Sequence, residues 1–220
     1  MQRLRIAIPI YPGVDLIDVT VPFDVFTRIP QFWKERELDL QLVAAAKGTS
    51  VVTGQNITLT STAAFDDYND EPPTVLLVPG AYITSGATGD AELMKWIAEQ
   101  GAKAEIVASV CTGALVLAKA GLLDQYRATT HWAALGTLTA FKSVRVVNGY
   151  PRWVRDRNRI TGGGISSSLD TAIYLVSILT NEQTAKCVQL LIQYNPHPPF
   201  ETGDPAVADQ KTYLLTAYDS

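Results

Sequence analysis

Short apolar runs rich in β-branched residues alternate along this chain with runs that have helical spacing. Strands are expected over residues 3–10, 38–45, 74–80 and 104–110 and within 144–161, and helices over 16–29, around 90–100, and over 113–123, 133–141, 166–180 and 182–194. Pro22 is expected to interrupt the first helix early, and residues 51–60 indicate a hairpin turning at Gly54-Gln55. Apolar strands without polar alternation indicate a mostly parallel sheet that helices cover on both faces. The predicted fold class is therefore α/β.

Composition and charge narrow the class of protein. Hydrophobic residues make up 47% and charged residues 18%, as in an ordinary globular protein, and no shift in composition marks a linker. We therefore expect one α/β domain over residues 1–195, followed by a proline-bearing tail over 196–220. The net charge is −4, and the densest basic stretch, RWVRDRNR at 152–159, is short and interrupted by an acid. A nucleic-acid binder would carry a larger basic footprint.

The lengths of the apolar runs and the spacing of cysteine and histidine predict the localisation and the absence of a metal site. The first apolar run is too short for a secretory signal, and no run approaches the roughly 18 apolar residues of a membrane span. The chain is therefore predicted to be cytoplasmic, with no membrane partner. Two cysteines and two histidines without CxxC or HExxH spacing predict no metal site.

Ligands of open α/β sheets gather at the carboxyl ends of the strands. Three loops should meet there, after Pro9, Val78 and Val110. The candidate functional residues lie in these loops or just after them. They are Asp15 and Asp18, Gly80-Ala81, and Cys111-Thr112.

Cys111 stands at the joint between an expected strand and an expected helix. Such a sharp turn lifts the side chain out of the sheet, as at a nucleophile elbow. The amides of a helix starting near Gly113 would favour the thiolate and lower the thiol pKa. The alternative is a small buried apolar side chain, and this is the interpretation for Cys187, which lies among apolar residues in mid-helix.

A reactive cysteine needs an acid or base within reach. Asp18 is one candidate, because a carboxyl beside a thiolate in a dry cleft would be pushed toward its protonated form. Its alternative role is to stabilise the N-terminus of a helix. His131, in RATTHW, is a second candidate, as a base or substrate-binding group, or else a half-buried structural histidine. His197 is a weaker candidate, and Thr112 is either a filler of the elbow or a hydroxyl facing the site.

Two glycine-bearing turns complete the set of candidates. The amides of Gly80-Ala81 follow a buried strand, where they could stabilise a developing anion. TGGGIS, at 161–166, is neither a dinucleotide-binding fingerprint nor a P-loop, so it is interpreted as a close-packed turn.

Several stretches in chain order carry a resemblance to a known family. They are YPGVDLIDVTVPFDVF (11–26), LLVPGA (76–81), SVCTGALVLAKAGLLDQYRATTHW (109–132), RITGGGISSSLDTAIYLV (159–176) and VQLLIQYNPHPPF (188–200). Together they resemble the ThiJ/PfpI family of the class I glutamine-amidotransferase-like superfamily, and within it the isonitrile hydratase branch.

This resemblance implies a flavodoxin-like α/β sandwich that forms a homodimer and uses a strained elbow cysteine without a cofactor. By position, Cys111 matches the nucleophile, Asp18 the acid beside it and Thr112 the adjacent threonine. Protease-like and deglycase-like members carry histidine after the cysteine and glutamate at the first loop, which argues against those activities here. The branch has Gly-Gly where this chain has Gly80-Ala81, so the pocket should be slightly narrower.

The implied reaction is the hydration of an isonitrile substrate to an N-substituted formamide through a thioimidate on Cys111. The Thr112 hydroxyl and the amides near Gly80-Ala81 would position water and stabilise charge. Two other classes stay open. One is a binding module that senses a small molecule, since the same domain occurs fused to DNA-binding regions, although too few residues follow Tyr194 for such a region here. The other is a stress protein whose Cys111 oxidises reversibly.

Overall fold

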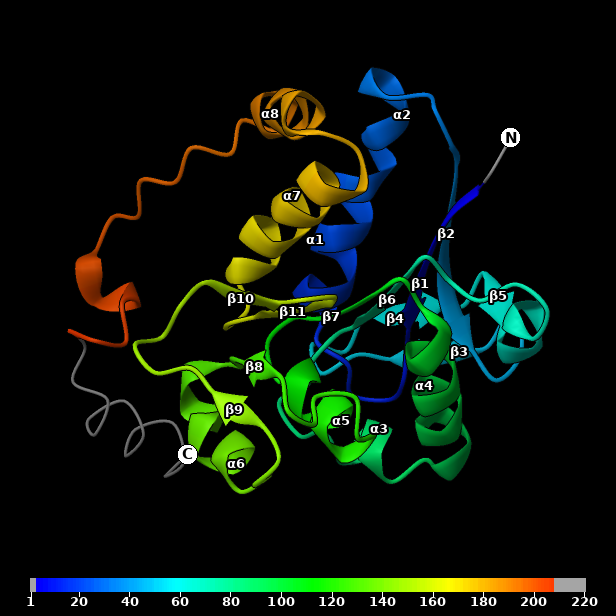
Figure 1. The fold of residues 1–220 in the computed structure, drawn as a ribbon, viewed down its shortest axis with the longest axis horizontal. Coiled ribbons are helices and arrows are strands. Elements are labelled where there is room, and N and C mark those ends of the chain that lie inside the picture. The colour runs from blue at the N-terminus through cyan, green and yellow to red at the C-terminus, as the bar shows by residue number, and fades with distance from the viewer. Residues whose placement is uncertain (1–2, 208–220) are drawn as a thin grey trace.

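A computed structural model describes residues 3–207, in which a central sheet lies between two layers of helices (Figure 1). The strands are β1 (Arg3–Pro9), β2 (Glu37–Ala44), β3 (Ser50–Val52), β4 (Thr58–Thr60), β5 (Ala63–Ala64), β6 (Val75–Val78), β7 (Ile106–Ser109), β8 (Arg127–Ala128), β9 (Arg145–Val146), β10 (Trp153–Asp156) and β11 (Arg159–Gly162). The helices are α1 (Leu16–Thr27), α2 (Ile29–Phe32), α3 (Ser85–Thr88), α4 (Ala91–Lys103), α5 (Gly113–Lys119), α6 (Leu135–Thr139), α7 (Ser167–Leu179) and α8 (Glu182–Leu191). Short 3₁₀ turns occupy Phe65–Tyr68, Trp132–Ala134 and Glu201–Gly203.

The main sheet has the strand order β10-β11-β7-β6-β1-β2-β5. Only β10 runs antiparallel to its neighbour, and every other pairing in this sheet is parallel. The order places β7, β6 and β1 side by side, so the loops at their carboxyl ends emerge at one edge of the sheet. The predicted meeting of these three loops is confirmed.

Helices cover both faces of this sheet. Figure 1 shows α1, α2, α7 and α8 on one side and α3, α4, α5 and α6 on the other. All four residues of β6 are buried, which explains why this strand has no polar alternation. The α/β class and the mostly parallel sheet predicted from the sequence are confirmed.

Two helices differ from their predicted extents. α1 continues through Pro22, although a proline at this position cannot donate the usual hydrogen bond to the Asp18 carbonyl; the predicted interruption is wrong. α5 ends at Lys119 instead of residue 123, because Gly121 adopts a φ of +74°. The amides of Gly121 and Leu122 then bond back to the last turn of the helix, as in a Schellman motif.

The shortest elements have no periodic signal in the sequence. β5, β8 and β9 are two residues long, and α2 and α3 are four residues long. The predicted hairpin is confirmed as β3 and β4, which pair antiparallel. Its turn bears Gly54 and Gln55, as expected.

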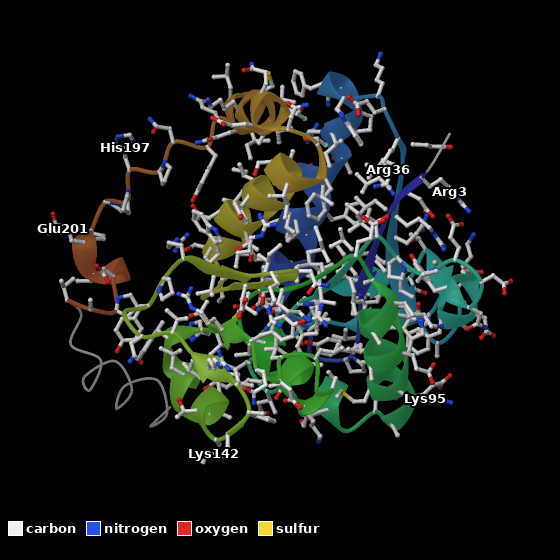
Figure 2. All side chains as sticks on the ribbon, viewed as in Figure 1. Arg3, Arg36, Lys95, Lys142, His197 and Glu201 are labelled. Carbon is white, nitrogen blue, oxygen red and sulfur yellow. The ribbon has the colours of Figure 1, made fainter. Side chains whose placement is uncertain are left out.

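The predicted tail begins after α8. Figure 2 shows His197 and Glu201 on a segment that runs along the periphery of the molecule, and His197 is exposed, with Nδ1 contacting the Asn195 carbonyl. Residues 208–220 of the tail lie outside the described part of the chain. No helix within residues 3–207 has the length and apolar character needed to cross a bilayer.

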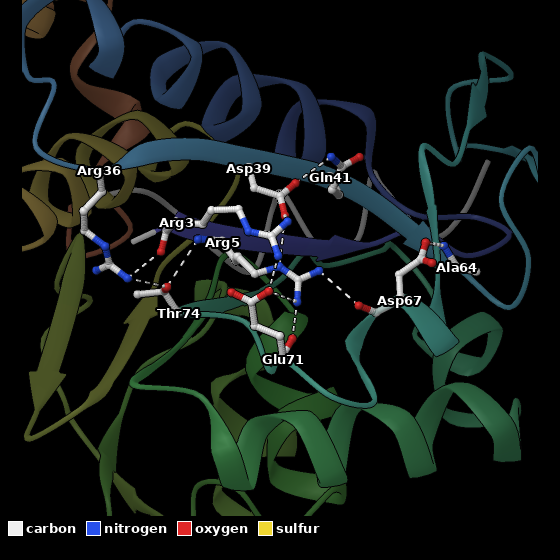
Figure 3. A network of polar contacts seen from close by, with 9 residues as sticks. All are labelled: Arg3, Arg5, Arg36, Asp39, Gln41, Ala64, Asp67, Glu71 and Thr74. Atoms are coloured by element: carbon white, nitrogen blue, oxygen red, sulfur yellow. Dashed lines mark hydrogen bonds and ion pairs between the residues drawn. The ribbon is translucent and has the colours of Figure 1, made fainter. Parts of the chain in front are cut away.

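A polar network joins β1 and β2 to the segment that leads into β6 (Figure 3). At its centre is Arg5, which is only 6% exposed. Its Nε donates to Asp39 Oδ2 at 2.9 Å, and its terminal nitrogens donate to the carbonyls of Asp67, at 3.1 Å, and Glu71. The guanidinium also lies 4.3 Å from the centre of the Tyr68 ring. One buried cation therefore fixes the path of the chain between β5 and β6.

We expect Arg5→Met to lower the free energy of unfolding by about 3 kcal/mol, because Asp39 loses its nearest cation and two backbone carbonyls lose a donor in a largely buried position. Urea denaturation at neutral pH measures this. The matched control is Lys186→Met, which removes a cation from the exposed pair with Glu182 on α8; it should leave the free energy of unfolding unchanged. Equal losses in the two variants would contradict the role assigned to Arg5.

Candidate active site

A cavity of about 660 Å³ opens where β1, β6 and β7 end. Its floor includes Cys111 and Thr112. The other residues that line it are Asp15, Gly54, Gln55, Ala81, Tyr82, Ile83, Thr84, Leu115, His131, Ala133, Ala134, Thr137 and Ile165. Most of this wall is aliphatic or aromatic, so the cavity suits a small ligand with an apolar body.

Cys111 occupies a strained turn between β7 and α5. Its φ is +52°, a conformation that costs an L-residue about 1–2 kcal/mol. The Cys111 amide donates to the Gly163 carbonyl at 2.8 Å, and the Thr130 hydroxyl donates to the Cys111 carbonyl at 2.9 Å, so both sides of the strained residue are held. A side chain at Gly113 would lie 2.1 Å from the Val78 carbonyl oxygen. The predicted sharp strand-to-helix turn is therefore present.

Asp18 lies in the first turn of α1 and is fully buried. Its Oδ2 accepts the Gly80 amide at 3.1 Å, and its Oδ1 accepts the Ser168 hydroxyl at 3.2 Å. A side chain at Gly80 would lie 2.6 Å from both the amide nitrogen and the hydroxyl of Thr112, and 2.9 Å from Asp18 Oδ2. Glycine is therefore needed at position 80, where the loops after β6 and β7 pack against the carboxyl.

Burial and a nearby carboxylate alter the proton affinity of this carboxyl. Burial, and after it the charge of Asp15, raise the pKa of Asp18 to about 7, against the opposing hydrogen bonds from Gly80 and Ser168. The carboxyl therefore exchanges its proton near neutral pH, as a desolvated acid in a dry cleft was predicted to do.

The thiol differs from the sequence prediction. Burial, and after it the charge of Asp18, raise the pKa of Cys111 well above its ordinary value, and the Thr112 amide only partly offsets this. The expected lowering by the helix is wrong, because α5 is short and the thiol is 5% exposed beside a carboxyl. At rest the proton therefore lies on sulfur, and thiolate forms only when the thiol proton is passed on.

Thr112 and Ala81 bond to each other. The Thr112 hydroxyl accepts the Ala81 amide at 2.8 Å and donates to the Ala81 carbonyl at 2.6 Å. Because the Gly80 amide is taken by Asp18, both amides of this turn already have acceptors within the protein. The anion-stabilising role predicted for the Gly80-Ala81 amides therefore does not agree with the structure, and of the two alternatives for Thr112 the hydrogen bonds favour a filler of the elbow. These groups fix the shape of the site instead.

His131 lines the cavity and is half-buried. Its Nδ1 accepts the Ala133 amide at 3.2 Å, so a neutral ring carries its hydrogen on Nε2. Burial lowers the pKa of His131, although the charge of Asp15 opposes this. A side chain at Gly164 would lie 2.5 Å from the ring. His131 is thus packed in place as a neutral side chain whose Nε2–H can donate.

The glycines of TGGGIS pack closely, as predicted. A side chain at Gly162 would lie 2.5 Å from the Thr171 hydroxyl, and one at Gly163 would lie 3.2 Å from the Pro151 carbonyl oxygen. With Gly164 against His131, all three glycines allow close contact between neighbouring segments. No group of three histidine, cysteine or acidic side chains suited to a metal ion occurs within the part of the chain described.

Two residues of the site have no assigned role in the sequence analysis. Asp15 caps α1, and its Oδ1 accepts the Ile17 amide at 3.0 Å. Gln55, from the β3–β4 turn, donates to Asp15 Oδ2 at 2.8 Å. An acid directly before an apolar helical run is an N-cap signal, so the sequence could have predicted that Asp15 caps this helix. The long-range contact with Gln55 has no local signal.

Comparisons with known proteins indicate the family and the fold. The DJ-1/PfpI family model matches residues 4–177. The isonitrile hydratase of Pseudomonas putida is 37% identical over 208 residues, which cover 94% of this chain and 86% of that protein. The crystal structure of a ThiJ/PfpI family protein from Pseudomonas syringae has a TM-score of 0.85 at 34% identity and covers 99% of this chain and 87% of its own. DJ-1beta of Drosophila melanogaster, at 17% identity, shares the fold, with a TM-score of 0.77 over 89% of this chain and 100% of its own.

The raised pKa of Asp18 predicts how stability changes with pH. Between its ordinary value of 3.8 and about 7, the folded protein holds a proton at Asp18 that the unfolded chain has released. The stabilisation from this proton is therefore complete at low pH and is lost as pH rises through this window, by up to about 4 kcal/mol. We expect Asp18→Asn to gain stability relative to the wild type between pH 4 and pH 8, measured by urea denaturation at each pH. A difference between the two proteins that stays constant with pH would contradict a protonated Asp18.

Proposed function

Since the chain belongs to the DJ-1/PfpI family, we propose that it is an isonitrile hydratase in which Cys111 is the nucleophile and Asp18 carries the proton. The identity to the hydratase of Pseudomonas putida, which extends over nearly the whole chain, supports this reaction class. The observation that carries the proposal is the strained, cavity-facing Cys111 next to a buried carboxyl with a pKa of about 7.

The first step forms a carbon–sulfur bond. Ionised Asp18 accepts the thiol proton of Cys111, and the resulting thiolate adds to the terminal carbon of R–N≡C. The carbon then takes the proton from the Asp18 carboxyl, which yields the thioimidate R–N=CH–S–Cys111. The high pKa of the resting thiol makes this transfer necessary, and a partner that titrates near neutral pH is suited to it.

The second step is hydrolysis. Asp18, again ionised, removes a proton from a water molecule that attacks the thioimidate carbon, and passes this proton to the nitrogen. The carbon–sulfur bond then breaks as the new hydroxyl gives its proton to Asp18, which returns it to the leaving thiolate, and the N-substituted formamide R–NH–CHO is released. Atoms balance with water as the only co-reactant, so the reaction requires no cofactor.

The remaining residues hold the reacting groups in position. The hydrogen bonds between Thr112 and Ala81 hold the elbow against the turn after β6, and the Gly80 amide and Ser168 orient the carboxyl. In this proposal Thr112, Gly80 and Ala81 act by position, and the Nε2–H of His131 is a donor toward the bound substrate. Aliphatic walls at Leu115 and Ile165 accommodate the R group.

The homodimer, the cytoplasmic location and the division between domain and tail at residue 195 stay predictions. So do the binding-module and redox-responsive alternatives. Peroxide-driven mass gain on Cys111 without turnover would favour a redox function, and tight ligand binding that survives Cys111→Ser would favour a binding module.

A hydration assay tests the proposed reaction. Purified protein is incubated with para-nitrophenyl isocyanide while formamide formation is followed. We expect Cys111→Ala to abolish turnover and Asp18→Asn to lower it by about 100- to 10,000-fold, the range typical of a lost general acid–base. Matched controls are Cys187→Ala, at the other cysteine, and Asp24→Asn, at an exposed acid on the same helix as Asp18; both should keep wild-type rates.

Wild-type protein that turns over neither small nor bulky isonitriles would overturn the hydratase proposal. Turnover lost in Cys111→Ala but kept in Asp18→Asn would retain the nucleophile and move the proton to His131 or water.

A further inference from the structure

The β3–β4 hairpin reaches the reactive cavity through its turn. Gly54 and Gln55 line the cavity together with Asp15 and Cys111. Backbone hydrogen bonds anchor the hairpin to the loop before α1: the Gly54 amide donates to the Val14 carbonyl at 3.0 Å, and the Gly13 amide donates to the Val52 carbonyl at 2.8 Å. The hairpin is therefore fixed against the start of the helix that bears Asp18.

Gln55 binds both the cap and the first turn of that helix. Its Nε2 donates to Asp15 Oδ2 at 2.8 Å, and its Oε1 accepts the Leu16 amide at 2.9 Å. The other oxygen of Asp15 accepts the amides of Ile17 and Asp18. Asp15 is 8% exposed, and within residues 3–207 no lysine, arginine or histidine forms an ion pair with it. Only neutral donors hold this carboxylate, so its charge acts on its neighbours.

We propose that Gln55 and Asp15 form a positioning pair, in which the hairpin amide holds a fixed negative charge beside Cys111 and Asp18 and thereby controls the proton transfer between them. Neither residue is assigned a chemical step. The consequence for catalysis rests on the proposed hydration reaction, whereas the effect on the thiol does not depend on it.

The titratable groups around Asp15 respond to its charge. They are Tyr11 after β1, Asp18 on α1, Cys111 at the elbow and His131 before the Trp132–Ala134 turn. Burial has the largest effect on the pKa of each, and the Asp15 charge adds to it at Tyr11, Asp18 and Cys111 and opposes it at His131. Removing this charge should therefore make the thiolate easier to form, and adding a second one should make it harder.

The test is the pH dependence of Cys111 alkylation by iodoacetamide, followed by intact mass in a Cys187→Ser background. We expect Asp15→Asn to move the midpoint to lower pH by roughly one unit and Gln55→Glu to move it to higher pH. Asparagine is itself a favoured N-cap, and Gln55 is exposed in a turn, so both variants should fold. Gln55→Glu alone still tests the pair if Asp15→Asn does not fold. Glu99→Gln, at an exposed acid on α4, is the charge-matched control and should leave the midpoint unchanged.

Midpoints that stay at the wild-type value in both variants, or that move in the same direction, would overturn the positioning pair. Alkylation does not require turnover, so the two proposals fail separately. Unchanged midpoints in a protein that hydrates isonitriles would reject only the pair, whereas shifted midpoints in a protein without hydratase activity would reject only the reaction.

Discussion

The carboxyl of Asp18 is the group on which the rest of this site depends. It comes from the helix after β1, accepts the amide of Gly80 after β6, and lies beside the thiol of Cys111 after β7. Ser168, on α7, supplies its third contact. Because adjacent parallel strands end at one edge, a single buried carboxyl can bind three loops. The packing of these loops around the carboxyl keeps water away, and this burial raises its pKa although the hydrogen bonds themselves lower it.

This arrangement has a cost in the backbone. Cys111 adopts a left-handed conformation, and two bonds, from its amide to Gly163 and from Thr130 to its carbonyl, hold it there. Gly80 and Gly113 permit contacts too short for any side chain. Strain at a reactive residue persists only where its surroundings determine it fully. The close packing around the elbow thus holds Cys111 in the strained conformation in which it lines the cavity.

Much of this could be predicted from the sequence, and the remainder could not for definite reasons. The apolar strands, the loops at their carboxyl ends and the elbow at Cys111 follow from local patterns, as do the candidates Asp18 and His131. The partners of the Gly80 and Ala81 amides, by contrast, lie 62 and 31 residues away in the chain, so local patterns left these amides free for an anion. The pKa of Cys111 was predicted from the helix alone to be lowered. It is raised instead, because burial and the charge of Asp18 outweigh the effect of a helix of seven residues. Gln55 was identified only as a turn residue, since nothing local indicates that it contacts Asp15.

Rapid-quench mass spectrometry of the protein mixed with an isonitrile tests directly whether Cys111 and Asp18 share the reaction. We expect wild-type Cys111 to gain the full mass of the substrate during turnover, since addition of the thiol to R–N≡C loses no atoms. We also expect this adduct to accumulate far more slowly in Asp18→Asn, where the thiol proton has no acceptor. Turnover without an adduct on Cys111, or an adduct that forms equally fast in Asp18→Asn, would show that these two residues do not share one proton and one reaction.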